Sequence, residues 1–597
     1  MFEWSKNKAQ WCLFLLWSII TLTLIYHHAF WMDEVINLIF GIGADNTYGI
    51  HGNGHPALWF LLLRGLFAVF HKVWVLPLAS FIVAASAVWL FLFKSPFSLR
   101  FKVLFLCSNF ALYEYVVMAR NYGISMLIMF ILAIIVTNKK IKENFTGPCL
   151  FFLCNTNILS VIISMSYSLG ITLSAAKDKT IRTYEVRKFL YKTLLFNFFG
   201  ALICILTVYP TFDTDAEKNL NDLFDINNVK NVLFIAKPFN KMTYAPYFNH
   251  SNKSIINRID DAYGKEKNKQ IAEYLIDDQE CLNEYKSKIY TERCLLKFDG
   301  HRKSLTYSVL KSLFSAACSI LMILSLFSLY GELSLFVAAS VSLFGLATFF
   351  AFIYWGAYRH QALWWVFMIT LLWISKTQEH IFSARVVKVR RIGYGAFVCL
   401  MLLQIWPALD NAYNEIFNTP NSNSRKLSDL INGDNSIKNS AIMASSDLLL
   451  ESIHYYNKNP TFVMSEKKFA LVFPFGANEK TTYNLDDILD SANYVALCNR
   501  VPVLILLSQP DISDDRVKIE DVKKPTLYRY IYLNFYVNPE QLVRLQSQTR
   551  KIASFDQSLN ESGFSVYELA AKDAHIKGAC TPNYIFDPKM FDLEREH

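Results

Sequence analysis

The sequence predicts a polytopic α-helical membrane protein of about eleven transmembrane helices, followed by a soluble α/β domain. Three observations predict this fold class. Hydrophobic residues make up 53% of the 597 residues and the mean hydropathy is +0.23, more apolar than ordinary soluble proteins. Apolar runs of about 20 residues recur over residues 1–409, separated by short basic loops. From Asp410 onward, polar and apolar residues mix as they do in a soluble domain.

The basic residues predict the orientation of the chain. Lys6 and Lys8 precede the first apolar run, roughly 10–30, so the N-terminus is expected inside and the following residues outside. This run is too long for the apolar core of a cleaved signal peptide. The net charge of +9 does not indicate nucleic-acid binding, because the basic residues concentrate in loops between apolar runs. We expect the cytoplasmic (inner) membrane as the location, with the C-terminal domain outside.

Residues 31–73 are predicted to form an outer loop with interfacial helices. The apolar stretch 55–71 is short for a crossing and carries Arg64 near its middle. If it crossed, the basic clusters within 94–102 and 139–142 would both fall outside, against the positive-inside rule. If it lies along the outer interface, both clusters fall inside. We adopt the interfacial interpretation.

The stretch 148–176 must begin and end inside, although its residues rise only about 43 Å in a helix, too little for two full crossings. It predicts two shortened helices with Asn155-Thr156-Asn157 at or near the bend. Residues 210–304 then form a large outer loop, in which Lys265–Lys288 is expected to be helical. The single crossings that follow the outer loop 31–73 are expected at 74–93, 103–119, 121–137, 189–209, 305–330, 332–354, 360–376 and 392–409.

Residues 410–597 are predicted to form an extracytoplasmic α/β domain, which is long enough to build its own core. Apolar or alternating segments predict strands, and amphipathic segments predict helices. The expected strands are Ala441–Ser445, Tyr494–Cys498, Val503–Leu507 and Phe564–Leu569, and the expected helices are Leu448–Tyr456 and Pro539–Arg550.

Four of the eleven cysteines lie in polar regions, and none has the close CxxC spacing of a zinc site. In an oxidising compartment we expect Cys281 to pair with Cys294 and Cys498 with Cys580, because each pair stays within one outer segment, although four cysteines allow three connectivities. No His, Asp or Glu cluster has metal-ligand spacing. The sequence therefore predicts a reaction without a metal cofactor, with a divalent cation left open.

The candidate catalytic residues are Asp33 and Glu34, an acidic pair where the first apolar run ends. Charges are costly in lipid, so the pair lies in the headgroup zone or in a wet cavity, unless it only marks the water boundary. Aromatic and basic residues at such a boundary are often interfacial anchors. If such residues lie close to the acidic pair, however, the pair can supply a carboxylate base and the basic residues can hold an anionic group. Two such constellations are expected on the same outer face, Tyr113-Glu114-Tyr115 with Arg120-Asn121-Tyr122, and the stretch Tyr354–His360.

These residues resemble the pattern of the GT-C class of glycosyltransferases. The pattern has an acidic pair after the first transmembrane helix, a His-Pro-x-Leu interfacial helix, an Ala-Arg-x-Tyr turn and a late Arg-aromatic turn. The likeness covers roughly residues 1–376 and looks like the branch of protein mannosyltransferases and lipid A aminoarabinose transferases. Ala57 replaces the second proline of the usual His-Pro-Pro form, and Arg-His stands where many relatives have Arg-Tyr. The matching residues are Asp33-Glu34, His55-Pro56-Ala57-Leu58, Ala119-Arg120-Asn121-Tyr122 and Tyr358-Arg359-His360.

The resemblance implies an inverting transfer of a sugar from a polyprenyl-phosphate donor, whose lipid lies in the bilayer, to a hydroxyl of a glycan, lipid or protein acceptor. Asp33 would remove the proton of the acceptor hydroxyl as that oxygen attacks the anomeric carbon. Glu34 would orient the acceptor or repel a second anion. Cations would stabilise the charge that grows on the phosphate in the transition state.

The same resemblance implies a set of substrate-binding residues. Arg359 is the first candidate for the phosphate contact, with His360 and Arg120 behind it. Tyr122 belongs to the same turn as Arg120. His55 would contact sugar or phosphate, or alternatively cap the interfacial helix.

Three other functions stay open. An O-antigen polymerase or ligase also uses polyprenyl-linked sugars, but its chemistry lies in a late outer loop and would not need Asp33. An oligosaccharyltransferase would carry a Trp-Trp-Asp motif in the soluble domain, whereas Trp364-Trp365 lies in an expected crossing. A transporter would show repeated halves and charges near mid-bilayer, and the sequence shows neither.

Overall fold

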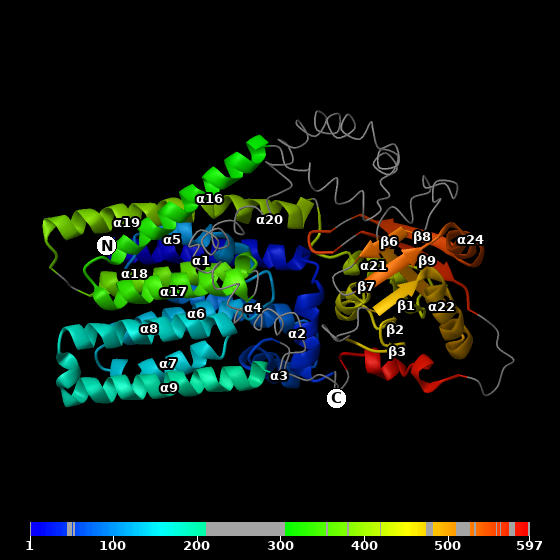
Figure 1. Cartoon of the computed structure of the whole chain (residues 1–597), viewed down its shortest axis with the longest axis horizontal. Helices are drawn as coiled ribbons and strands as arrows, with labels where there is room; N and C mark the ends of the chain where they lie inside the picture. The colour runs from blue at the N-terminus through cyan, green and yellow to red at the C-terminus, as the bar shows by residue number, and fades with distance from the viewer. Residues whose placement is uncertain are drawn as a thin grey trace, which may run out of the picture.

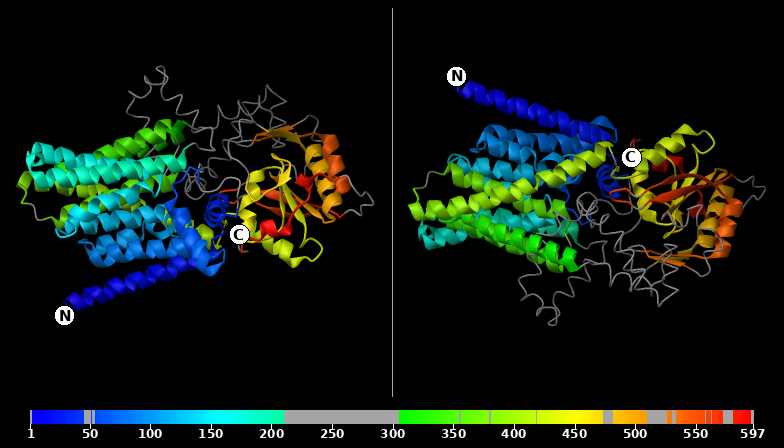
Figure 2. Two further views of the ribbon diagram at one scale, coloured as in Figure 1. Left: turned by 90° about the horizontal axis from the view of Figure 1, so that it is seen from below. Right: turned by 90° about the horizontal axis from the view of Figure 1, so that it is seen from above.

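The helices and strands form two bodies that lie end to end, a helical bundle and an α/β domain (Figure 1). The N-terminus lies at the bundle end away from the α/β domain, and the views from below and above show the same arrangement (Figure 2). The expected loop 210–304, with its helix Lys265–Lys288 and the pair Cys281 and Cys294, lies outside the described residues. The computed structural model describes residues 2–44, 51, 54–209, 305–353, 356–378, 381–417, 419–472, 481–508, 526–529, 533–556, 558–561, 563–571 and 580–594.

Six helices of the described part are long and apolar enough to cross a membrane, so the bundle has the character of a membrane protein. The six segments are Lys8–His27, Val75–Lys94, Ile158–Lys177, Tyr184–Val208, Leu333–Phe350 and Ala384–Phe417. The expected count of eleven crossings is therefore not confirmed. The helices that run along the bundle are α1 (Phe2–His27), α4 (Val75–Lys94), α6 (Tyr122–Thr137), α7 (Lys142–Cys154), α8 (Ile158–Lys177), α9 (Tyr184–Val208), α16 (Leu305–Leu326), α17 (Leu333–Phe352), α18 (Tyr358–Thr377), α19 (Ala384–Leu403) and α20 (Ile405–Phe417).

The expected crossing 103–119 is not one continuous helix. Helix α5 (Leu99–Leu106) ends early, a π-helical turn follows at Phe110–Glu114, and further turns lead to α6. Asn109 starts the break, and its side-chain oxygen accepts a hydrogen bond of 3.0 Å from Asn411 on α20. Single π-turns of this kind often occur at functional sites.

The stretch 148–176 belongs to two helices, as predicted, and α7 and α8 meet at the turn Asn155–Asn157. The expectation that both are shortened is wrong for α8, which has 20 residues and is long enough to cross a membrane. The turn is buried, and its polar groups have partners. Asn121 donates to the carbonyl of Thr156 at 2.7 Å, and Asn157 donates to Ser125 at 2.7 Å. Buried polar groups need such partners, and these bonds tie the turn to the start of α6.

The short helices α2 (Met32–Ile42) and α3 (Leu58–Phe70) lie across the bundle end that faces the α/β domain (Figure 1). Because α3 does not run along the bundle, α1 and α4 are antiparallel. The N-terminus and Lys94 therefore both lie at the bundle end away from the α/β domain. Trp11 on α1 accordingly contacts Phe93 on α4, with ring centroids 4.7 Å apart. This placement agrees with the interfacial interpretation, while the side of the membrane stays a prediction.

The α/β domain is built on a six-stranded sheet of order β3-β2-β1-β5-β9-β8, in which β1 is parallel to β2 and β5, and β9 is antiparallel to β5. A three-stranded sheet has the order β4-β7-β6. The strands are β1 (Ala441–Ala444), β2 (Thr461–Val463), β3 (Lys468–Phe469), β4 (Thr481–Asn484), β5 (Val503–Ser508), β6 (Thr526–Arg529), β7 (Leu533–Val537), β8 (Arg550–Phe555) and β9 (Phe564–Leu569). The helices are α21 (Ser424–Gly433), α22 (Leu485–Asn499) and α24 (Pro539–Gln548).

Three of the four expected strands are confirmed as β1, β5 and β9, and the expected helix at Pro539 is confirmed as α24. The strand expected at Tyr494–Cys498 is wrong, because those residues belong to α22. Asn484 caps that helix by accepting the N–H of Asp487 at 3.0 Å, and a short apolar run alone cannot separate helix from strand. Leu448–Tyr456 forms 3₁₀ turns rather than an α-helix. The boundary expected at residue 410 falls inside α20.

The disulfide between Cys498 and Cys580 is present, as predicted. It joins the end of α22 to the C-terminal segment, 82 residues later in the chain.

Candidate functional site

The candidate site lies where the end of α1, helix α2, the turn before α6 and the start of α18 meet, at the bundle end next to the α/β domain (Figure 1). Its central group is the carboxylate of Asp33, in the first turn of α2. One oxygen of this carboxylate forms an ion pair with Arg120, and Arg359 reaches the same oxygen at 3.2 Å. Segments far apart in the sequence thus converge on one carboxylate.

The charges of this cluster differ in their access to solvent. The side chain of Asp33 is 27% exposed, whereas those of Arg120 and Arg359 are only 5% and 10% exposed. Burial raises the pKa of Asp33, but the charges of Arg120 and Arg359 outweigh it and hold that pKa below its usual value. Among these three side chains two cations face one anion, and the nearby Glu114 is held partly neutral because burial raises its pKa to about 7, so the arginines suit a bound anion.

Local sequence explains why Asp33 occupies this position. Helix α2 begins at Met32, and carboxylates in a first helical turn are favoured by the exposed N–H groups and the helix dipole. The helix ends at Gly43, whose positive φ of 79° suits a residue without a side chain. At Gly41 a Cβ atom would lie 3.0 Å from the Cβ of Leu63, so the glycine lets α3 pack closely beneath α2.

Arg120 is held by the turn between the π-helical segment and α6. Gly123 permits that turn, because a Cβ atom there would lie 2.8 Å from the carbonyl oxygen of Tyr115. One guanidinium nitrogen of Arg120 donates to Nε2 of His55 at 3.0 Å. Burial and the charge of Arg120 lower the pKa of His55 to about 3, so its ring is neutral and accepts this bond. The alternative role of His55 as a helix cap is wrong, because α3 begins only after Ala57.

Arg359 lies in the first turn of α18, directly opposite Asp33. The hydroxyl of Tyr115 donates to the backbone carbonyl of Arg359 at 2.8 Å, which fixes the start of this helix. The guanidinium lies over the ring of Trp31, 5.3 Å from its centre, a cation–π arrangement that adds to the hold on the cation.

His360 and Tyr122 line the same corner. Nδ1 of His360 accepts the backbone N–H of Ala357 at 2.9 Å, so the ring orientation is set by the helix start. The rings of Tyr122 and His360 meet edge to face with centroids 5.2 Å apart. The structure therefore brings all of the sequence-predicted binding residues, His55, Arg120, Tyr122, Arg359 and His360, into one cluster with Asp33.

Glu34, the second carboxylate of the pair, has a different environment. It is fully buried, and protein donors surround both of its oxygens. His28 Nε2 lies 3.0 Å from one oxygen, which also accepts the N–H of Trp31 at 3.2 Å, and the other oxygen accepts the N–H of Ala119 at 2.6 Å. A carboxylate with these contacts holds backbone in place and has little capacity left for a substrate.

Sequence reasoning did not find His28 or Glu415. Both are fully or nearly buried, and Nδ1 of His28 lies 3.2 Å from a carboxylate oxygen of Glu415 on α20. The hydroxyl of Tyr113 donates to the same oxygen. The signal was present in the sequence, because an ionisable residue at the end of an apolar run is expensive to bury without a partner.

The α/β domain holds the turn that leads into α2. Arg425 on α21 donates to the last two carbonyls of α1, those of Tyr26 and His27, at 3.0 and 3.3 Å, and to that of the next residue, His28, at 2.7 Å. The N–H of Phe30 donates to the hydroxyl of Tyr456 at 2.7 Å. The domain is thus a structural part of the site.

Within the described ranges, no three His, Cys, Asp or Glu side chains are grouped so that they could hold a metal ion. The expectation of a reaction without a metal cofactor stays a prediction.

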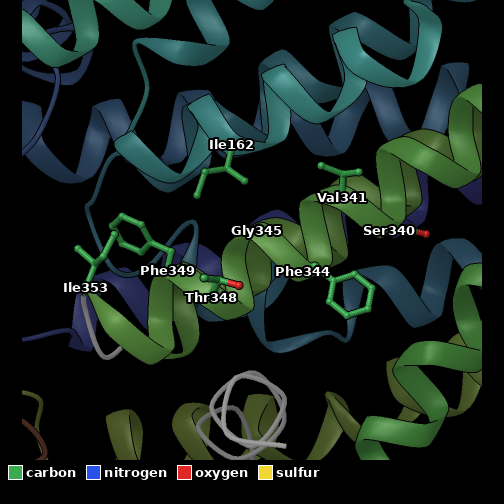
Figure 3. A pocket seen from close by; sticks show the side chains of 8 residues that line it. All are labelled: Ile162, Ser340, Val341, Phe344, Gly345, Thr348, Phe349 and Ile353. Atoms are coloured by element: carbon green, nitrogen blue, oxygen red, sulfur yellow. The ribbon is translucent and has the colours of Figure 1, made fainter. Parts of the chain in front are cut away.

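An apolar groove of about 570 Å³ opens on the side of the bundle between α8 and α17 (Figure 3). Its wall on α17 continues to Ile353, the residue after the end of that helix. Phe350 at this end of α17 lies near His360, with ring centroids 6.5 Å apart. The groove therefore runs toward the cationic corner of the site. Its lining residues are Ile162, Ser340, Val341, Phe344, Gly345, Thr348, Phe349 and Ile353.

These features define a class, an α-helical membrane protein whose charged site lies at one end of the bundle beneath an α/β domain. No protein-family model matches the chain, and no curated protein matches it in sequence.

Proposed function

We propose that this protein is a membrane glycosyltransferase of the GT-C type, which transfers a sugar from a polyprenyl-phosphate donor to a hydroxyl of a glycan, lipid or protein acceptor. The strongest support is the meeting of two buried arginines at one partly exposed carboxylate, Asp33. The pattern of motifs that resembles the GT-C class converges on this same carboxylate.

The arginines suit a phosphate group. A guanidinium presents two parallel N–H donors to phosphate oxygens, and buried guanidinium groups attract an anion more strongly than exposed ones. In the proposed complex the phosphate lies between Arg359 and Arg120. Negative charge grows on the phosphate as the bond to the sugar breaks, and positive groups placed there stabilise the transition state.

Asp33 is the proposed base. Its lowered pKa keeps it ionised near neutral pH, and a bound phosphate would share the two arginine charges that lower this pKa. The carboxylate takes the proton of the acceptor hydroxyl, and the acceptor oxygen forms a bond to the anomeric carbon. The bond between that carbon and the phosphate oxygen breaks from the opposite face, and its electron pair leaves with the polyprenyl phosphate. The sugar configuration is inverted.

The remaining groups take supporting roles in this proposal. Neutral His55 orients Arg120, and His360 lines the phosphate corner beside Tyr122. The groove between α8 and α17 would take part of the isoprenoid chain, because its lining is mostly apolar and includes Phe349, the neighbour of Phe350, whose ring lies near that of His360. Glu34 holds the backbone instead of contacting the acceptor. The proposed site faces the outer side of the cytoplasmic membrane.

The test compares wild type with Asp33→Asn, which keeps the size of the side chain and removes the base. Transfer should fall by about 10²–10⁴-fold, the usual contribution of a general base, while donor binding is largely kept. Asp178→Asn is the matched control, because Asp178 is exposed after the end of α8 at the far end of the bundle.

Two measurements serve this test. Mass spectrometry of glycans and lipids compares cells that carry each variant, and release of polyprenyl phosphate from a polyprenyl-phosphate hexose is followed with purified protein. Arg359→Ala should weaken donor binding as well as turnover, with partial recovery in Arg359→Lys. Near wild-type transfer by folded Asp33→Asn would contradict the proposal.

A further inference from the structure

Helices α1, α2 and α20 and the π-helical turn meet at one imidazole, that of His28. Its Nε2 lies 3.0 Å from Glu34 and its Nδ1 lies 3.2 Å from Glu415, and all three side chains are buried. An ionised carboxylate only accepts hydrogen bonds. The two carboxylates lie at the two nitrogens of the ring and favour its protonated form, so we treat the ring as an imidazolium between two carboxylates.

Glu34 connects this imidazolium to both reacting groups of the proposed site. Glu34 is the neighbour of Asp33 on α2, and its carboxylate accepts the N–H of Ala119, the neighbour of Arg120, at 2.6 Å. The same carboxylate accepts the N–H of Trp31 at 3.2 Å. The carboxylate of Glu34 thus links the backbone next to Asp33 with the backbone next to Arg120, in addition to the direct ion pair between the two side chains.

Glu415 connects the imidazolium to the α/β domain. It belongs to α20, the helix that leads directly into that domain. Tyr113 of the π-helical turn donates to the same Glu415 oxygen that faces His28, which fixes this carboxylate in turn. The titratable groups around the imidazole are thus Glu34 from α2, Glu415 from α20, and Tyr113 and Glu114 from the π-helical turn.

We propose that His28 is a positioning residue, which holds Asp33 and Arg120 at their working separation through Glu34 and ties that separation to the α/β domain through Glu415. The role of Asp33 and Arg120 in transfer rests on the proposed function. The contacts that position them do not, and they can be tested separately.

The alternative is that the cluster only stabilises the bundle. If the cluster only stabilised the bundle, each variant would have a lower thermal midpoint. In variants that still fold, the exchange of amides near Arg120 would then not change more than that of other bundle amides. A positioning role instead predicts that the Ala119 amide loses its protection while the rest of the bundle keeps its own, because that amide depends on Glu34 alone.

The experiment is hydrogen-exchange mass spectrometry, with fragmentation to single residues, on full-length protein in detergent. His28→Gln should speed the exchange of the Ala119 amide at least about 10-fold, with the amides of α18 unchanged. Glu415→Gln, the milder change, should have the same effect, and it keeps the proposal testable if His28→Gln does not fold. His27→Gln is the matched control, since His27 is the exposed neighbour at the end of α1.

The double variant of His28→Gln and Glu415→Gln should lose no more protection than His28→Gln alone, because both changes break one chain of contacts. In the transfer assay, kcat of His28→Gln should fall by about 10–100-fold, as for other groups that orient a reacting residue, and KM for the donor should change less. If wild type shows no transfer, the proposed function fails and the exchange measurement still decides on positioning. An unchanged Ala119 amide in folded His28→Gln and Glu415→Gln, or additive losses in the double variant, would overturn the inference.

Discussion

Arg425 provides the sharpest test of how the α/β domain is attached to the bundle. Its guanidinium lies at the C-terminal end of α1 and donates to three backbone carbonyls there, the closest being that of His28 at 2.7 Å. It also lies over the ring of Tyr456, 5.3 Å from the centre. Arg425→Ala removes all of these contacts and leaves the end of α1 without its cation.

The size of the effect follows from the environment of each contact. The partly buried bond to His28 contributes about 1.5 kcal/mol, and the two solvent-exposed bonds to Tyr26 and His27 contribute about 1 kcal/mol together. We therefore expect the attachment to weaken by about 2–3 kcal/mol, which corresponds to a factor of about 30–150 in the opening equilibrium.

The amide of Phe30 reports this opening, because it donates to the hydroxyl of Tyr456 only when the domain is attached. Its hydrogen-exchange rate should rise by about 30–150-fold in Arg425→Ala. Arg425→Lys should recover part of the protection, since an ammonium reaches fewer carbonyls at once. Lys426→Ala, at the exposed neighbouring position, is the control. A rate within twofold of wild type in folded Arg425→Ala would refute the reasoning.

Two further predictions concern orientation and the disulfide. Ser98→Cys and Thr180→Cys place thiols at exposed positions of the bundle end away from the α/β domain, and these should react with an impermeant thiol reagent only from the inside. Lys438→Cys, in the α/β domain, should react only from the outside. Reaction of Ser98→Cys from the same side as Lys438→Cys would contradict the interfacial placement of α3. Cys580→Ser should lower the thermal midpoint of the α/β domain. The bond to Cys498 closes a long loop, and in the chain-entropy model this closure contributes about 4–5 kcal/mol to the free energy of unfolding. An unchanged midpoint would contradict this.

The elements that depend on length and charge were predictable from the sequence. The bend at Asn155–Asn157 follows from the limited rise of the stretch 148–176, and the placement of α3 follows from the positions of the basic loops. Only α7 is short, since α8 has 20 residues. The break within 103–119 was not predictable, because the partner of Asn109 there is Asn411, about three hundred residues later in the chain. Tyr494–Cys498 was assigned to a strand because five residues are too few to show a helical period.

The candidate site also has features that the sequence predicted and features that it did not. Residue type and order indicated Asp33, Arg120 and Arg359, and the structure places them together. Apart from the family resemblance, residue type does not separate Asp33 from Glu34, since the two carboxylates differ in burial and in the contacts of Glu34 with His28 and Ala119. Such contacts come from segments that meet only in the folded chain.

Helix α18 has a consequence for how the protein enters the membrane. Every residue from Tyr358 to Ser375 is buried within the protein, and α18 is not among the six segments that are apolar enough to cross alone. A helix that begins with Tyr-Arg-His-Gln is poorly suited to contact lipid on all sides. Its neighbours α6 and α17 precede it in the chain, so they have left the ribosome when α18 emerges. We expect α18 to be accommodated by this earlier scaffold, so Arg359 reaches the site only after the segments that carry Asp33 and Arg120 have been made.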